Sequence, residues 1–232
     1  MLVTSLVPVF LVLAHGIPSC AAAVTHVANR PSRHCSNNTL PSQYTITAYK
    51  KDDATINGLK VQGGGAFIIG QANVSSYCPS VVQESGGCPN GTQTALAGSL
   101  YPLSLVPGGQ ELYVDVNGAV RITVQHSHSI PPGAYPYYLG WTWTPFSSCA
   151  SPCSRECPRD DPRYDCGAPE GYWTFKSPDE DVGGLYACPA EYNANATQLF
   201  ARTPAFNQTG CAALDGLATH NYTGPSPPVW AY

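Results

Sequence analysis

The chain has 232 residues, of which 11% carry a charge, and its net charge is −4 at pH 7. So few basic side chains provide no positive surface for a phosphate backbone, which argues against DNA or RNA as a partner. The length suits one domain with a buried core, and 22 Gly and 22 Pro without a long helical periodicity argue against extended helices.

The first 23 residues are typical of a secretory signal peptide. An apolar run from Leu6 to Leu13 is too short to span a bilayer, and small residues follow it, with cleavage expected after Ala21 or Ala23. No later segment has the length and hydrophobicity of a membrane span or of a lipid-anchor signal. We therefore expect a soluble protein that is secreted to the extracellular space or the cell wall.

Residues 24–42 are expected to form an irregular N-terminal segment, and residues 43–232 are expected to form a single β domain. Short runs of alternating apolar and polar residues, separated by Gly and Pro, predict short strands. These runs are 44–50, 59–62, 66–70, 100–105, 112–116, 120–125, 171–176, 185–188, 198–202 and 212–219. The spacing is typical of an antiparallel β-sandwich or barrel, and the choice between the two stays open.

The segment 111–124 predicts the central hairpin. A two-residue turn at Asn117 and Gly118 would mix apolar and polar side chains on each face. A type I turn with Gly118 as a left-handed bulge residue instead places Leu112 opposite Ile122 and makes one face apolar. We expect the bulged hairpin, with Val114 opposite Val120 in the core.

A Cys-rich insertion occupies about residues 145–170, where Pro, Cys and charged residues replace aliphatic ones. Such a segment buries too little apolar area to become ordered without cross-links. We expect a disulfide-rich loop inserted between strands.

Ten cysteines occur, and loss of Cys20 with the signal peptide would leave nine, so one thiol is free or pairs between molecules. Spacing does not fix the pairing. Proximity in sequence favours local pairing among one group, which is Cys149, Cys153, Cys157 and Cys166. A second group is expected to cross-link the main fold, and it consists of Cys78, Cys88, Cys188 and Cys211. Cys35 is then left over.

Six Asn-x-Ser/Thr tripeptides occur, where about two are expected by chance from the composition. The excess predicts an N-glycosylated secreted protein whose glycan sites lie outside the core. The six asparagines are Asn37, Asn73, Asn90, Asn195, Asn207 and Asn221.

Residue types that could support chemistry form no convincing site. Disulfides are favoured over a metal at the spaced cysteines 149, 153 and 157. His126 and His128 could share a metal on one strand face, but no third ligand is near, so a polar strand end is favoured. The acidic residues 179–181 are interpreted as a solvated turn and not as a hydrolytic pair. We predict no catalytic residues, no metal, no cofactor and no enzymatic activity.

Five aromatic residues crowd the segment 135–143 and are candidate carbohydrate-binding residues. A row of exposed rings could stack on sugar faces, but large aromatic side chains are usually buried, which favours core packing. The five are Tyr135, Tyr137, Tyr138, Trp141 and Trp143.

Several segments in order along the chain resemble a family of fungal secreted proteins described as IgE-binding or allergen-like, related to phialide cell-wall proteins. The segments that support this resemblance are 44–49, 65–67, 111–120, 171–175, 184–189, 199–201, 210–219 and 230–232. The resemblance implies a non-enzymatic secreted or wall-associated β protein with no catalytic residues, and it implies structural roles for Cys78, Cys88, Cys188 and Cys211. Residues 145–170 and Cys35 depart from the family pattern.

These observations predict a structural or interaction glycoprotein of the fungal wall or extracellular space. One alternative is a carbohydrate-binding module whose partner is wall polysaccharide. Another is a secreted effector whose partner is a host surface protein, reached through the rigid Cys-rich loop.

Overall fold

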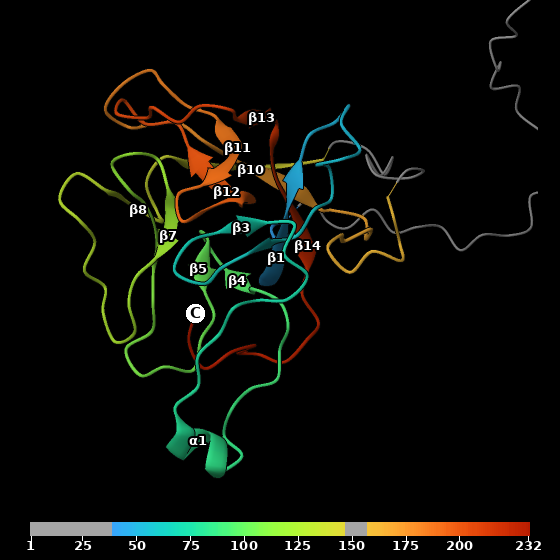
Figure 1. The fold of residues 1–232 in the computed structure, drawn as a ribbon, viewed down its shortest axis with the longest axis vertical. Helices are drawn as coiled ribbons and strands as arrows, with labels where there is room; N and C mark the ends of the chain where they lie inside the picture. The colour runs from blue at the N-terminus through green and yellow to red at the C-terminus, as the bar shows by residue number, and fades with distance from the viewer. Residues whose placement is uncertain (1–38, 147–156) are drawn as a thin grey trace, which may run out of the picture. The chain divides into compact units, whose positions relative to one another are not determined.

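The computed structural model describes residues 39–146 and 157–232 (Figure 1). They form antiparallel β-sheets that curve into a half-barrel, together with one short helix. The predicted all-β antiparallel fold is thus confirmed. Among these residues, no helix is long and apolar enough to cross a membrane. The predicted signal peptide, 1–23, and residues 24–38 of the predicted irregular segment lie outside the described residues.

The largest sheet has six strands in the order β5-β4-β1-β14-β10-β9. Their bounds are Tyr101–Pro102, Leu96–Ala97, Gln43–Tyr49, Gly216–Asn221, Gly171–Phe175 and Trp141–Pro145, respectively. The longest pairing in this sheet joins β1 to β14, with Tyr44 opposite Asn221 and Tyr49 opposite Gly216.

The second sheet has five strands in the order β13-β11-β12-β3-β2, and a third has three strands in the order β7-β6-β8. The five strands are Ala212–Leu214, Leu185–Ala190, Asn193–Ala201, Ile68–Ile69 and Val61–Gln62. The three strands are Val120–Ile122, Leu112–Val114 and Tyr135–Pro136.

The hairpin of β6 and β7 has the predicted bulged register. Leu112 lies opposite Ile122 and Val114 lies opposite Val120, while Tyr113 and Arg121 share the other face. Gly118 has a φ of 92°, and its N–H donates to the carbonyl of Asp115 at 2.8 Å. The apolar pattern selected this turn, because the alternative would have placed polar side chains in the core.

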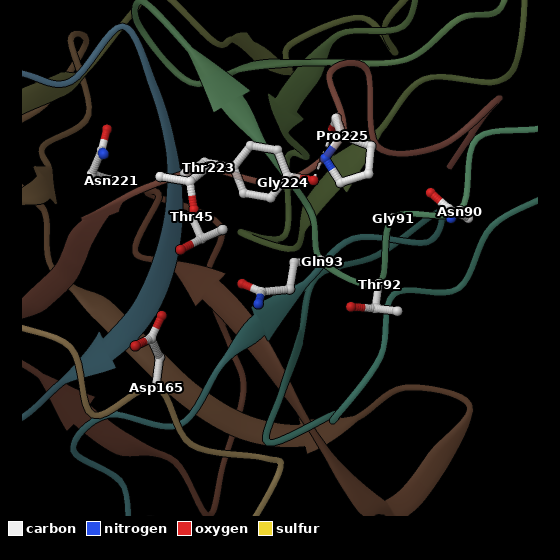
Figure 2. A pocket seen from close by; sticks show the side chains of 11 residues that line it. Thr45, Asn90, Gly91, Thr92, Gln93, Asp165, Asn221, Thr223, Gly224 and Pro225 are labelled. Atoms are coloured by element: carbon white, nitrogen blue, oxygen red, sulfur yellow. Dashed lines mark hydrogen bonds between the residues drawn. The ribbon is translucent and has the colours of Figure 1, made fainter.

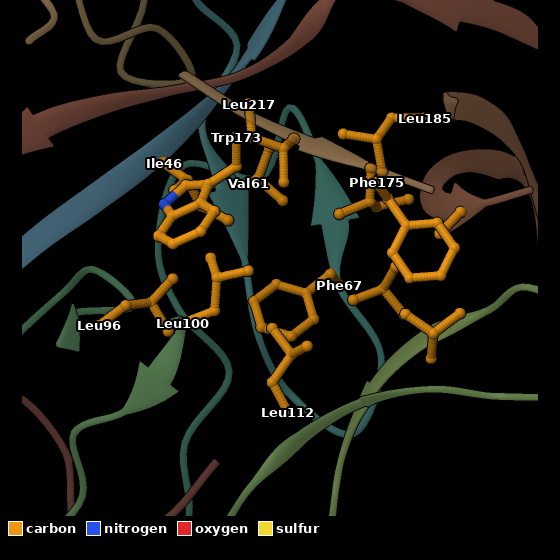
Figure 3. Packing of buried hydrophobic residues seen from close by; sticks show 14 of the residues in the cluster. Ile46, Val61, Phe67, Leu96, Leu100, Leu112, Trp173, Phe175, Leu185 and Leu217 are labelled. Atoms are coloured by element: carbon orange, nitrogen blue, oxygen red, sulfur yellow. The ribbon is translucent and has the colours of Figure 1, made fainter. Parts of the chain in front are cut away.

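Side chains from all three sheets meet in one apolar core (Figure 3). Ile46 and Leu217 come from the six-stranded sheet, Leu185 from the five-stranded sheet, and Leu112 from the central hairpin. Phe67 lies among them and is fully buried. Burial of such side chains stabilises the fold by about 1.5–3 kcal/mol each relative to exposure.

The face of β1 that points away from this core is buried as well. Thr45 and Thr47 lie on that face and are 6% and 1% exposed. Part of the Cys-rich insertion packs nearby, since Tyr164 bridges to Leu59 and the N–H of Asp165 donates to the carbonyl of Gly58 at 2.9 Å. The insertion therefore helps to cover the outer side of the six-stranded sheet.

Some elements differ from the predicted ones. Strands β4, β8 and β9 lie outside the predicted runs, and only Tyr101–Pro102 of the run 100–105 forms a strand. Leu100 takes a left-handed φ of 68°, and its N–H donates to the hydroxyl of Tyr44 at 3.0 Å. The turn before β5 is thus fixed by a distant tyrosine that local sequence does not reveal. A five-residue helix, α1 (Ser80–Glu84), was also not predicted.

Candidate functional site

A polar pocket of about 370 Å³ lies beside the end of the β1–β14 pair (Figure 2). Its lining comes from four separate parts of the chain: Thr45, residues 90–93, Asp165 and residues 221–225. The volume lies at the low end of the range for ligand pockets, roughly 300–1,000 Å³. The size suits a ligand of about one or two sugar rings.

Backbone contacts fix the two segments that face each other across this pocket. The N–H of Gly91 donates to the carbonyl of Pro228 at 2.8 Å. A Cβ at Gly91 would lie only 2.5 Å from Pro228, so this close approach requires glycine. On the other segment, the N–H of Tyr222 donates to the carbonyl of Gln43 at 3.0 Å, and its hydroxyl donates to the carbonyl of Pro225 at 2.8 Å. The pocket walls are therefore held by hydrogen bonds within the chain.

The lining combines neutral hydrogen-bonding groups with one carboxylate and one aromatic ring. Amides come from Asn90, Gln93 and Asn221, the carboxylate from Asp165, and the ring from Tyr222. Among the described residues that line the pocket, none carries a positive charge. Amides donate and accept hydrogen bonds, and a tyrosine ring offers apolar area. This set suits a neutral ligand rich in hydroxyl groups.

Asp165 also connects the pocket to a buried histidine. Oδ1 of Asp165 lies 3.8 Å from Nδ1 of His220, and it accepts the N–H of Gly167 at 2.9 Å. On the opposite side of the ring, Nε2 of His220 lies 3.0 Å from the hydroxyl oxygen of Thr47. Burial lowers the pKa of His220, and the neighbouring carboxylate opposes this effect.

The order hydroxyl, imidazole, carboxylate is the order of groups in a nucleophilic triad. Here, however, Thr47 is 1% exposed and His220 is 4% exposed. A nucleophile must reach the atom that it attacks, and this hydroxyl is buried. Asp165 is held instead by the N–H of Gly167, and the arrangement gives Thr47 no access to a substrate.

Sequence reasoning missed this group and the pocket. Thr47, Asp165 and His220 lie on different elements, and no spacing rule joins them. The nearest sequence signal was the pair of sequons at Asn90 and Asn221, which marked surface positions but gave no reason to place them together.

The structure places the five predicted aromatic residues differently from one another. Tyr138 is 63% exposed, whereas Tyr135 is buried and accepts a hydrogen bond from the Ser177 hydroxyl at 3.2 Å. Tyr137 is half-buried, and its ring lies 5.6 Å from the ring of Tyr101.

The two tryptophans of β9 are partly buried against the core. Trp141 packs edge-on against Phe175 with 5.2 Å between ring centroids. Nε1 of Trp143 donates to the hydroxyl oxygen of Thr219 at 3.2 Å. The five residues thus do not form one row of equally exposed rings, and their binding of carbohydrate stays a prediction.

Three disulfides join predicted half-cystines in the described part of the chain. They are Cys78–Cys88, Cys157–Cys166 and Cys188–Cys211. The predicted disulfide bonding of the protein is confirmed in this respect. Cys35, Cys149 and Cys153 lie outside the described residues.

All five described sequon asparagines are exposed: Asn73, Asn90, Asn195, Asn207 and Asn221. Asn37 lies outside the described residues. These exposed positions are suited to bulky hydrophilic glycans, whose attachment stays a prediction.

The other candidates for chemistry have ordinary surface partners. His126 donates from Nδ1 to the carbonyl of Pro107, and His128 pairs with Glu111, each at 2.8 Å. Asp181 pairs with Lys176 in an exposed turn, and this ion pair lowers the pKa of the aspartate. No cluster of three or more metal-ligating side chains occurs among the residues that the structure describes.

Comparison with known proteins adds one relative. The chain is 30% identical over 227 residues to an "uncharacterized secreted protein" of Arthroderma benhamiae, and the match covers 96% of this chain and 97% of the relative. No family model and no solved structure matches the chain.

The fold and the relative together define a secreted, disulfide-bonded, all-β protein of fungal type. The chain belongs to the family of fungal secreted proteins that includes the Arthroderma benhamiae protein.

Proposed function

We propose that the protein is a non-enzymatic, allergen-like extracellular glycoprotein of the fungal wall, and that it binds a short saccharide segment of wall polysaccharide in the polar pocket. Secretion brings the folded chain into contact with wall polysaccharide. Disulfide cross-links stabilise a folded domain outside the cell. The allergen-like character is taken from the resemblance to IgE-binding proteins.

The observation that carries the binding proposal is the chemistry of the pocket lining. Gln93 and Asp165 present polar groups to the same volume as the ring of Tyr222. A sugar ring has hydroxyl groups along its edge and apolar C–H groups on its faces, so it can use both kinds of contact. A strongly anionic ligand would meet the Asp165 carboxylate without a compensating cation in the lining.

The buried state of Thr47 and His220 supports a binding role over a hydrolytic one. Hydrolysis through this group would require the hydroxyl to reach the pocket, and Thr47 is absent from the pocket lining. We expect no turnover of wall polysaccharide by the purified protein.

A polysaccharide pull-down with the secreted protein tests the proposal. The Gln93→Ala and Tyr222→Ala variants should each lose retention on chitin or β-glucan by roughly tenfold, since each removes a contact worth about 1–1.5 kcal/mol. Gln83→Ala on α1 and Tyr192→Ala, which removes a 69% exposed ring, are the matched controls and should bind like the unmodified protein.

Circular dichroism should show that all four variants keep the β fold. Retention that persists unchanged in the two pocket variants rejects the pocket as the binding site. Retention that is lost on replacing Trp141 and Trp143 with Ala, in a protein that still folds, would support the alternative carbohydrate-binding segment 135–143.

A further inference from the structure

Two sequons border the same pocket. Asn90-Gly91-Thr92 and Asn221-Tyr222-Thr223 are far apart in the chain, yet all six residues line this one pocket (Figure 2). Asn90 and Asn221 are both exposed, as are the hydroxyl-bearing residues Thr92 and Thr223. The other described sequons, at Asn73, Asn195 and Asn207, contribute nothing to the pocket lining.

The two sequon segments are held at the pocket by backbone contacts. Residue 91 is fastened to Pro228, and the N–H of Val74 donates to the carbonyl of Thr92 at 2.9 Å. Asn221 is the last residue of β14 and pairs with Tyr44 in the sheet. A glycan attached at either asparagine would therefore start from a fixed point on the pocket wall.

The innermost sugar of an N-glycan is N-acetylglucosamine, which offers hydroxyl groups, an acetamide and an apolar ring face. The pocket lining presents the complementary groups, namely the Gln93 amide, the Asp165 carboxylate and the ring of Tyr222. A tether of a few bonds gives such a ligand an effective concentration in the millimolar range. A saccharide site with a Kd of about 0.1 mM would then be occupied mainly by the tethered sugar.

We propose that the pocket is occupied by the protein's own N-glycans, carried at Asn90 and Asn221, so that glycosylation controls access of external saccharide. The inference rests on the proposed saccharide-binding function of the pocket. Attachment forms a bond from Asn Nδ2 to C1 of N-acetylglucosamine. The C1–oxygen bond to a lipid-linked pyrophosphate breaks, the pyrophosphate leaves with the lipid, and the amide proton is released.

Site-resolved glycan release tests occupancy without an external ligand. The folded protein, secreted from a eukaryotic host, is treated with an endoglycosidase, and peptide mass spectrometry follows release at each site. Release at Asn90 and Asn221 should be roughly tenfold slower than at Asn73 and Asn207, because the pocket shields the inner sugars. The Gln93→Ala variant should raise the two slow rates to the control rates.

Equal release rates at all four sites would overturn the inference. So would an intact mass that changes only by the substitution itself in the Asn90→Gln and Asn221→Gln variants, with no loss of a glycan mass, because no glycan would then be present at the pocket.

Affinity measurements separate this inference from the proposed function. The double variant Asn90→Gln/Asn221→Gln should bind N,N′-diacetylchitobiose roughly tenfold more tightly than the unmodified glycoprotein, because the tethered competitor is gone. The control double variant Asn73→Gln/Asn207→Gln should show the unmodified affinity. Equal affinities in all three proteins would overturn the inference and leave the binding function intact. Slow release at the two pocket sites without binding of any external saccharide would support the inference and overturn the proposed function.

Discussion

Nδ1 of His220 lies 3.8 Å from Oδ1 of Asp165, and this contact joins strand β14 to the loop closed by the Cys157–Cys166 disulfide. The histidine is 4% exposed and its Nδ1 makes no hydrogen bond within the described structure. A buried imidazole of this kind should be neutral at pH 7, because burial lowers its pKa.

The first prediction concerns the pH dependence of stability. Below the ordinary histidine pKa of about 6.5, the unfolded chain takes up a proton more readily than buried His220 does. The contribution of neutral His220 to the free energy of unfolding is therefore present above about pH 6.5. It is lost as the pH falls, by at most about 1.4 kcal/mol per pH unit. Denaturant unfolding at pH 7.5 and pH 5.5 should show that acidification lowers the free energy of unfolding less in His220→Gln than in the unmodified protein.

The matched control for this prediction is His128→Gln, which removes an exposed histidine paired with Glu111. In this variant, acidification should lower the free energy of unfolding as much as in the unmodified protein. If acidification destabilises His220→Gln as much as the unmodified protein, the pKa of His220 is not lowered in the folded state.

The second prediction separates backbone conformation from close contact at two glycines. Gly118 and Gly65 have φ values of 92° and 84°, so alanine is strained at both. A Cβ at Gly118 would also lie 2.3 Å from the carbonyl oxygen of Ala201, whereas a Cβ at Gly65 meets nothing within 4 Å. Gly65→Ala should cost about 1 kcal/mol in the free energy of unfolding and Gly118→Ala clearly more. Equal losses in chemical denaturation would argue against the packing of the hairpin turn on β12.

The third prediction tests the centre of the core. Leu112 is 1% exposed and lies opposite Ile122, so Leu112→Ala should destabilise the fold by about 2–5 kcal/mol. Val116 lies in the turn of the same hairpin and is 40% exposed, so Val116→Ala should change stability by only about 0.5 kcal/mol. The midpoint of urea unfolding at constant slope measures both effects. A similar midpoint for the two variants would contradict the burial of Leu112 in the core.

The fourth prediction concerns the disulfide between Cys188 and Cys211, whose sequence separation is 23. Cys188 is also 1% exposed and packs with Ala119 and Phe200. The double variant Cys188→Ala/Cys211→Ala should lose about 2–5 kcal/mol, because the bridge restricts the unfolded chain and its sulfur fills part of the core. The Cys78–Cys88 disulfide closes a shorter loop, with a separation of 10, so the double variant Cys78→Ala/Cys88→Ala should lose less stability. Thermal unfolding followed by circular dichroism compares the two, and the reverse order would contradict this ranking.

Local sequence was sufficient to predict the parts of the fold whose pattern lies within one segment. In the hairpin 112–122, alternating apolar residues and Gly118 specify both the register and the turn. Strands β4 and β8 were missed because each has two residues and forms only where a neighbour pairs with it. Helix α1 was missed because its five residues, none of them buried, show no helical period.

The candidate site was beyond prediction for a different reason. Thr45, Gln93, Asp165 and Asn221 belong to four segments that meet through the pairing of β1 with β14, the contact of Gly91 with Pro228 and the packing of the Cys-rich insertion. The exposed sequons could be predicted because the tripeptide is local, whereas their position at one pocket depends on tertiary contacts.

The central claim is that the polar pocket binds saccharide, and chemical-shift mapping of the Asn90→Gln/Asn221→Gln variant, which carries no glycan at the pocket, tests it most directly. Titration with N,N′-diacetylchitobiose or a β-glucan disaccharide should shift the backbone amides of residues 90–93, Asp165 and residues 221–224. Shifts confined to residues 135–143, or no shifts with either sugar at millimolar concentration, would contradict it.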